Sequence, residues 1–256
     1  MAEVSTVEPF LSVAISAYNE EVRIGPSLRK IVAFLEQKGY PYEIVVNDDG
    51  SQDRTQDVVR SVGCSHIRLL STPRNEGKGA GIRRAILASR GTFILFTDAD
   101  LSTPIEEVDR LLAKLDEGYD VAIGSRVHPD GSDMRASQPF YRRVLGKLFH
   151  SLVVLWTVRG ISDTQSGFKC FRREVAHDLF ASSVLDSITF DVEILFLARK
   201  RGFLIGEVPV KWTNAGGSRM RVSSRHALRV LWDLARIPIV HRGKARRQAK
   251  KVLESR

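Results

Sequence analysis

Short apolar segments rich in β-branched and aromatic residues alternate, along the first half of the chain, with segments of helical periodicity. Five of them are strand candidates, at residues 11–16, 43–47, 67–71, 93–97 and 121–124. They show little polar alternation, which is typical of strands that are covered on both faces. Strands that alternate with helices predict an α/β fold, with a mainly parallel sheet and flanking helices.

The helical segments between these strands have recognisable ends. In residues 103–115 we place Thr103 as the N-cap and Pro104 at the first helical position, and Gly118 follows the last turn. The expected buried stripe of this helix consists of Ile105, Val108, Leu111, Leu112 and Leu115. Further helices are expected at 26–38, 53–62, 140–158 and 190–201, and a further strand at 205–212.

The 256 residues contain no internal repeat and no low-complexity linker. We therefore expect one domain over residues 1–222 and a basic, amphipathic helical extension over residues 223–256. Residues 219–256 contain twelve Lys or Arg and two acidic residues, whereas the whole chain carries a net charge of +9. Because the basic excess is terminal rather than spread over a folded face, we expect no nucleic-acid partner.

The expected extension separates its side chains by type when it is drawn as a helix. One side is apolar and consists of Ala227, Leu228, Leu231, Leu234 and Ala235. The opposite side is charged and consists of Arg225, Arg229, Asp233 and Arg236. Such a helix is predicted to lie on an anionic membrane surface; the alternative is a helix packed on the domain with a solvated basic end.

The sequence also indicates a compartment. The longest strongly apolar run covers residues 152–156, which is too short to predict a membrane span. Glu3 and Glu8 precede the first apolar run, unlike the basic start of a secretory signal. Cys64 and Cys170 are the only cysteines, which excludes a disulfide framework and a multi-cysteine zinc site. We expect a cytoplasmic protein that binds peripherally to the cytoplasmic face of a membrane.

Polar side chains follow three of the predicted strands. The segments are AYNEE at 17–21, DDGS at 48–51 and DAD at 98–100. In an open α/β sheet the ligand binds beyond the carboxyl ends of the strands. One acidic cluster at such a place is equally consistent with a turn and a helix cap. Three clusters at one edge of the sheet favour a ligand site.

Two short patterns at this edge favour a diphosphate ligand. Asp98 and Asp100 are hard oxygen ligands that can hold Mg²⁺ or Mn²⁺ and leave positions for a diphosphate; alternatively, Asp98 caps backbone groups and Asp100 faces water. Lys78 lies in the glycine-rich segment 75–81, before a helical pattern, where it can meet an anion or be a solvated loop lysine. The segment is not a P-loop, because Gly79 replaces the required Ser or Thr.

Taken in order, these motifs resemble those of the family 2 glycosyltransferases, which have a GT-A fold. The ordered set is AYNE at 17–20, DDGSQD at 48–53, NEGKG at 75–79, DAD at 98–100 and GSR at 124–126. Three later segments, DTQSGFK at 163–169, FDVE at 190–193 and EVPV at 207–210, resemble the polyprenyl-phosphate sugar transferases within that family. The similarity is greatest to the dolichyl-phosphate β-glucosyltransferases.

The resemblance implies a Rossmann-like GT-A domain and a role for each motif. The nucleoside would be bound by Ala17, Tyr18, Glu20, Asp48 and Lys78, with Asp48 and Lys78 close to the base. Asp98 would approach the ribose or the metal, and Asp100 would bind the metal. The donor and acceptor phosphates would be faced by Arg126, Gln165, Ser166 and Lys169. Two positions depart from the family pattern, because Ser16 replaces a common Pro, and Ser102 replaces a Gln found in mannosyl relatives.

A hydroxyl acceptor would need a general base, for which Asp191 and Glu193 are the candidates. A phosphate acceptor is already anionic, so these carboxylates would instead position other groups, or be a helix-starting Asp and a buried structural Glu. The resemblance implies an inverting transfer of glucose from UDP-glucose to a polyprenyl phosphate. The alternatives are GDP-mannose as the donor, a soluble hydroxyl acceptor, and a non-catalytic scaffold that binds a membrane.

Overall fold

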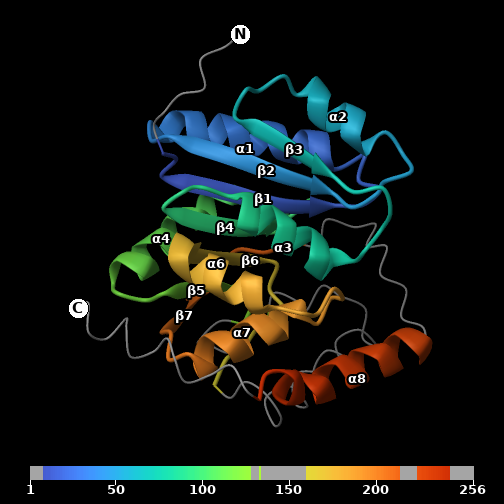
Figure 1. The fold of residues 1–256 in the computed structure, drawn as a ribbon. Helices are drawn as coiled ribbons and strands as arrows, with labels where there is room; N and C mark the ends of the chain where they lie inside the picture. Colours follow the sequence, from blue (N-terminus) through green and yellow to red (C-terminus); the bar gives the residue numbers. More distant parts are fainter. Residues whose placement is uncertain (1–7, 128–132, 134–159, 214–223, 243–256) are drawn as a thin grey trace.

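The computed structural model describes residues 8–127, 133, 160–213 and 224–242. Its strands form one sheet in the order β3-β2-β1-β4-β6-β5-β7 (Figure 1). Their bounds are Leu11–Ala17 for β1, Tyr42–Asp48 for β2, Ile67–Ser71 for β3, Phe93–Asp98 for β4, Val121–Ser125 for β5, Phe168–Arg172 for β6 and Ile205–Pro209 for β7. The strands β1 to β4 are parallel, whereas β6 runs antiparallel to its neighbours β4 and β5. The prediction of a mainly parallel sheet with flanking helices is confirmed.

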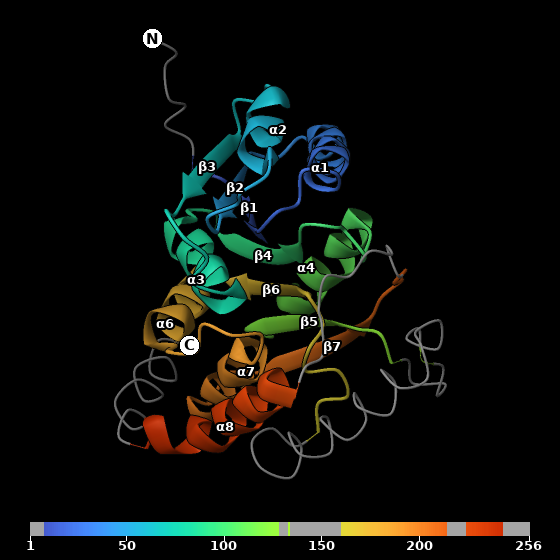
Figure 2. The ribbon, with the colours of Figure 1, turned by 90° about the vertical axis from the view of Figure 1, so that its right-hand side faces the viewer.

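Helices cover both faces of the sheet (Figures 1 and 2). One face packs on α1 (Ile24–Lys38), α2 (Thr55–Ser61) and α4 (Val108–Asp116), which follows the 3₁₀ turn η1 (Ile105–Glu107). The other face packs on α3 (Lys78–Ala88), α6 (Arg173–Ser182) and α7 (Phe190–Lys200), with α8 (Ser224–Val240) outside them. Each face therefore has its own apolar core, as apolar strands of a covered sheet require.

The predicted helix at 103–115 exists, but it begins differently. Its first turn is η1, whose N-cap position is Pro104, and no side chain caps it. Thr103 is therefore not the N-cap. The five residues of the expected stripe are all buried, and Gly118 ends the helix with a φ of 98°.

Two elements of the second half were not predicted, namely β6 and α6. The predicted helix at 190–201 is confirmed as α7, and the strand at 205–212 is confirmed with an earlier end, as β7. The predicted helix at 140–158 lies outside the described residues. Within the part of the chain that the structure describes, no helix is long and apolar enough to cross a membrane.

The extension is only partly as predicted. Val230, Leu234 and Ile237 of α8 join the core cluster that contains α7, and Asp233 is also buried. Leu234 and Asp233 thus both lie on the inner face of α8, whereas the prediction placed them on opposite sides of the helix. The outward side chains include Leu228, which is 67% exposed. The division at residue 222 stays a prediction.

Candidate active site

The three acidic segments meet at one edge of the sheet. In the register of the central strands, Ala17 lies beside Asp48, and Ser16 lies beside both Asn47 and Asp98. The segments that follow β1, β2 and β4 therefore leave the sheet side by side, as predicted. This adjacency places the carboxylates of Asp48, Asp98 and Asp100 around one rim.

The segments after β1 and β2 are fixed to each other by hydrogen bonds. The backbone N–H of Asn19, which has a φ of 56°, donates to Ser51 Oγ over 2.8 Å, and the N–H of Gln52 donates back to Asn19 Oδ1 over 2.7 Å. Glu20 is held by an ion pair of 2.5 Å with Arg23. Tyr18, which precedes Asn19 in the segment after β1, is 39% exposed, so its ring is accessible to a ligand.

Asp48 has an acceptor atom that the protein leaves unused. The residue is fully buried, and its Oδ2 accepts the backbone N–H of Ser51 over 3.2 Å and the amide of Gln56 over 2.8 Å. Its Oδ1 is buried and makes no hydrogen bond within the described residues. Because an unpaired buried acceptor is costly, Oδ1 is a strong candidate to accept a donor from a ligand.

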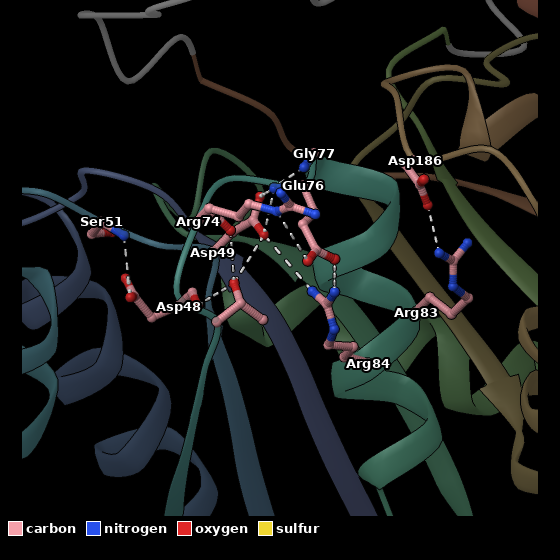
Figure 3. Close-up of polar contacts among 10 residues, drawn as sticks. Asp48, Asp49, Ser51, Arg74, Glu76, Gly77, Arg83, Arg84 and Asp186 are labelled. Atoms are coloured by element: carbon pink, nitrogen blue, oxygen red, sulfur yellow. Dashed lines mark hydrogen bonds and ion pairs between the residues drawn. The ribbon is translucent and has the colours of Figure 1, made fainter.

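The neighbouring carboxylate, Asp49, organises the glycine-rich loop (Figure 3). Its oxygens accept the backbone N–H groups of Glu76, over 3.1 Å, and Gly77, over 2.8 Å, and Arg84 Nη1 lies 3.8 Å away. Burial raises the pKa of Asp49, and the hydrogen bond from Gly77 works in the opposite direction. Sequence reasoning did not assign a role to Asp49, although its place beside Asp48 was the available signal.

Lys78 begins α3 and points to the end of β4. Its Nζ lies 2.7 Å from Asp98 Oδ1 and 5.5 Å from the centre of the Phe96 ring. Burial lowers the pKa of Lys78, but the carboxylates of Asp98 and Asp191 outweigh this effect, so that the pKa is raised. Lys78 is therefore a charged group beside Asp98.

Asp98 and Asp100 fit a cation that also binds a diphosphate. Their side chains are 35% and 25% exposed, and Arg23 Nη1 lies 3.6 Å from Asp100 Oδ2. Gly167 leaves space beside Asp98, because a Cβ at that position would overlap Asp98 Oδ2. The described residues contain no group of three His, Cys, Asp or Glu that could hold a metal alone. One or two carboxylates suffice, however, when phosphate oxygens complete the coordination of Mg²⁺.

Arg126 is held firmly at the end of β5. Its Nε and Nη2 each donate to Asp163 over 2.7 Å, and its backbone N–H donates to Asp163 Oδ2 over 3.0 Å. Burial lowers the pKa of Arg126, but Asp163 more than compensates, and the pKa is raised. The backbone of Asp163 is in turn held by Glu207, over 3.2 Å. Such a bidentate pair fixes the plane of the guanidinium.

The predicted acceptor segment contains a buried ion pair. Lys169 Nζ lies 2.5 Å from Asp191 Oδ1, with side chains that are 1% and 6% exposed. Lys169 also donates to the carbonyl of Ser166. Burial raises the pKa of Asp191, whereas Lys169 and Lys78 lower it. Gln165 is half-buried, and Ser166 is buried with no partner for its Oγ among the described residues.

Glu193 lies two residues after Asp191 on the first turn of α7, and its carboxylate contacts His241, the residue after α8. Its oxygens accept the backbone N–H groups of Val184, over 2.9 Å, and Leu185, over 3.0 Å. His241 Nε2 lies 2.7 Å from Glu193 Oε1, and both side chains are buried. The structure thus brings the other predicted site residues together at the sheet edge. The carboxylate of Glu193 instead binds Val184, Leu185 and His241.

The sequence matches the family model described as glycosyl transferase family 2 over residues 12–180. The chain belongs to this family. It is 39% identical over 241 residues to a dolichyl-phosphate beta-glucosyltransferase of Dictyostelium discoideum, with 89% of this chain and 73% of the relative covered. It is 41% identical over 227 residues to that of Drosophila melanogaster, covering 82% and 69% of the two chains. The protein is therefore a glycosyltransferase.

Solved structures show the same fold. A glucosyl-3-phosphoglycerate synthase from Mycobacterium tuberculosis, in complex with Mn²⁺, uridine-diphosphate-glucose and phosphoglyceric acid, superposes with a TM-score of 0.63. The two sequences are 20% identical, and the superposition covers 90% of this chain and 81% of the other. This likeness concerns the fold, which is GT-A.

Proposed function

We propose that this glycosyltransferase transfers glucose from UDP-glucose to dolichyl phosphate or a related polyprenyl phosphate, with inversion at the anomeric carbon. The observation that carries the proposal is the identity of 36–41% to dolichyl-phosphate beta-glucosyltransferases of Dictyostelium discoideum, Drosophila melanogaster and Homo sapiens, over 82–89% of this chain. The arrangement of charged groups at the sheet edge supports the same reaction.

The donor would bind over the ends of β1 and β2. Asp48 Oδ1 is a buried acceptor without a partner among the described residues, and it matches the ring N–H of uracil. Ala17, Tyr18 and Glu20 would line the nucleoside pocket beside it. Guanine also offers ring N–H donors, which is why GDP-mannose is the alternative donor.

The leaving diphosphate requires positive charge. Asp98 and Asp100 would hold Mg²⁺ or Mn²⁺, which supplies Lewis-acid stabilisation of the departing diphosphate when it is bound. Lys78, at 2.7 Å from Asp98, would add a positive charge on the same side. Nε and Nη2 of Arg126 are bound by Asp163, and its remaining guanidinium nitrogen, Nη1, would face a phosphate.

The acceptor would be a lipid phosphate, whose oxygen attacks the anomeric carbon while the bond from that carbon to the diphosphate oxygen breaks. The attacking oxygen is already anionic, so no proton has to be removed. Asp191 is therefore not needed as a general base, and its carboxylate is bound instead to Lys169 Nζ over 2.5 Å. We assign Asp191 the task of holding Lys169 near Gln165 and Ser166, where the acceptor phosphate would bind.

A lipid acceptor places the enzyme on a membrane. The outer face of α8 exposes Leu228, Leu231, Trp232 and Ile239, which are 46–67% exposed. The sequence around α8 is strongly basic, with twelve Lys or Arg against two acids over residues 219–256. We propose that this face lies on the anionic, cytoplasmic surface of a membrane as a peripheral contact.

The test is to offer the purified protein each radiolabelled donor separately, with dolichyl phosphate and Mg²⁺ or Mn²⁺. Label is then measured in the organic phase. We expect label from UDP-glucose and little from GDP-mannose. Label from GDP-mannose alone would overturn the donor. Label on a soluble saccharide, with none in the organic phase, would overturn the lipid acceptor.

A further inference from the structure

The buried Asp233 of helix α8 contacts a short stretch of chain, residues 184–189, which leads into α7. We call this stretch the lead-in segment. It lies between α8 on one side and the glycine-rich loop that carries Lys78 on the other. Asp191, on the first turn of α7, follows it directly.

The first contact from α8 is made by Asp233. Its Oδ2 accepts the hydroxyl of Ser187 over 2.6 Å and that of Thr189 over 3.1 Å. Thr189 is the N-cap residue of α7. Asp233 is 5% exposed, and Arg236 lies 3.8 Å from it on the same helix. Asp233 therefore fixes Ser187 and the N-cap residue of α7.

The second contact is made by His241, the residue that directly follows α8. His241 meets Glu193 of α7 over 2.7 Å, and Glu193 accepts the backbone N–H groups of Val184 and Leu185. The start of the lead-in segment is thus held by Glu193, which His241 contacts, and its end is held by Asp233 of α8. Hydrogen bonds to charged groups are stronger than those between neutral groups, which suits them to this task.

The other side of the lead-in segment supports the Lys78 loop. The backbone N–H of Gly79 donates to the carbonyl of Asp186 over 2.9 Å, and the Asp186 carboxylate pairs with Arg83 at 2.5 Å (Figure 3). A Cβ on Gly77 would overlap the Asp186 carbonyl, and one on Gly79 would overlap the Leu185 carbonyl. The two backbones are therefore in direct contact, and a shift of one requires a shift of the other.

We propose that Asp233 is a positioning residue for the transfer reaction, although it lies on α8 and outside the site itself. Through the lead-in segment, it fixes both the loop that presents Lys78 to Asp98 and the first turn of α7, which presents Asp191 to Lys169. This inference rests on the proposed function for its kinetic part. Its structural part, the coupling of α8 to the Lys78 loop, stands apart from the identity of donor and acceptor.

The test compares Asp233→Ala with Asp116→Ala, a matched control that removes the same side chain from an exposed position at the end of α4. Hydrogen exchange of the Leu185 and Gly79 amides is measured without substrates. Loss of hydrogen bonds to a charged group should speed exchange at both amides in Asp233→Ala by about tenfold. The control should leave both rates unchanged. Faster exchange at Leu185 with unchanged exchange at Gly79 would overturn the coupling.

Turnover supplies the second measurement, at a temperature well below the melting transition of each variant. We expect kcat of Asp233→Ala to fall by about tenfold at saturating donor and acceptor, and Asp116→Ala to keep the wild-type kcat. If Asp233→Ala does not fold, Asp233→Asn, which keeps one acceptor oxygen, should show smaller changes in the same direction. A folded variant with wild-type exchange at Gly79 and wild-type kcat would contradict the proposal. Absence of transfer in the wild type would count against the proposed function alone, because the exchange measurement does not need it.

Discussion

At the scale of single residues, neighbouring carboxylates have different surroundings. Asp48 has one buried oxygen without a hydrogen-bond partner in the described part of the chain, whereas the oxygens of Asp49 accept the backbone N–H groups of Glu76 and Gly77. The sequence predicted that this pair lies at the sheet edge. The sequence could not predict which of the two carboxylates binds the glycine-rich loop, because that depends on the path of residues 74–77 after β3.

Asp100 gives the most direct residue-scale prediction. Asp100→Asn keeps the size of the side chain and can still accept from Ser102, which now bonds Asp100 Oδ1 over 2.9 Å. It removes one of the two carboxylates proposed to hold the cation, so kcat should fall by about a hundredfold with an unchanged melting temperature. Undiminished turnover of this variant, or full wild-type activity in excess EDTA, would contradict the assignment.

Asp191 predicts a dependence of stability on pH. Its folded-state pKa is raised above 3.8 because of burial, so between 3.8 and the folded pKa the folded protein binds more protons than the unfolded chain. The contribution of Asp191 to the free energy of unfolding should therefore decrease as the pH rises through this window. Denaturant unfolding of wild type and Asp191→Asn over this range checks it. The free energy of unfolding of the wild type minus that of Asp191→Asn should fall as the pH rises. If this quantity stays constant or increases with pH, the pKa of Asp191 is not raised.

At the scale of elements, the strands covered on both faces were predicted well and β6 was not. The sequence of β6, FKCFR, contains a buried lysine, so it does not read as a continuous apolar strand. Its partner is Asp191, which is 22 residues away and on another element. A pattern of neighbouring residues cannot show such a pair. Helix α6 was not predicted either; it follows β6 with no residue between them, so no turn signal marks its start.

Two glycines test the contact between the segment after β2 and the glycine-rich loop. Gly50 and Gly63 have nearly equal φ angles, 71° and 68°. A Cβ on Gly50 would meet the Arg74 backbone, while one on Gly63 would meet no atom of the described residues within 4 Å. Gly63→Ala should cost about 1 kcal/mol of stability from the left-handed backbone alone. Gly50→Ala should cost about 1–3 kcal/mol more, because the loop must move.

The check on these two variants is denaturant unfolding combined with titration of UDP. Only Gly50→Ala should weaken nucleotide binding, since only it displaces the loop anchored by Asp49. Equal losses of stability in the two variants would show that the glycine-rich loop moves away from a Cβ on Gly50 at no cost in free energy. Equal nucleotide affinities would show that the loop does not shape the donor site.

At the scale of the whole molecule, the α/β class followed from the alternation of apolar strands with helices, and the convergence of the polar segments followed from their places at the ends of parallel strands. The position of α8 did not follow from the sequence, because α8 is apolar on two sides. Leu234 packs inward with α7, and Leu228 and Trp232 point outward, so periodicity alone could not choose the buried face. Residues 140–158 and 243–256, which carry further predicted features, lie outside the described part of the chain.

The outer face of α8 gives a whole-molecule prediction. Leu228→Gln combined with Leu231→Gln should lower sedimentation with anionic vesicles, because both side chains are exposed on the proposed membrane contact. Binding of the wild type should also fall as salt is raised. Leu87→Gln on α3, where Leu87 is 42% exposed, is the control and should bind as the wild type does. Equal losses in both variants, or none, would place the contact elsewhere.

The most direct measurement is the structure of the product. Wild-type protein is incubated with UDP-glucose, dolichyl phosphate and Mg²⁺, and the lipid is extracted and analysed by mass spectrometry and by the coupling constant of its anomeric proton. We predict one hexose added to the lipid phosphate, in the β configuration. An α-linked lipid, or a lipid that remains unmodified while glucose is transferred to another acceptor, would contradict the proposed reaction.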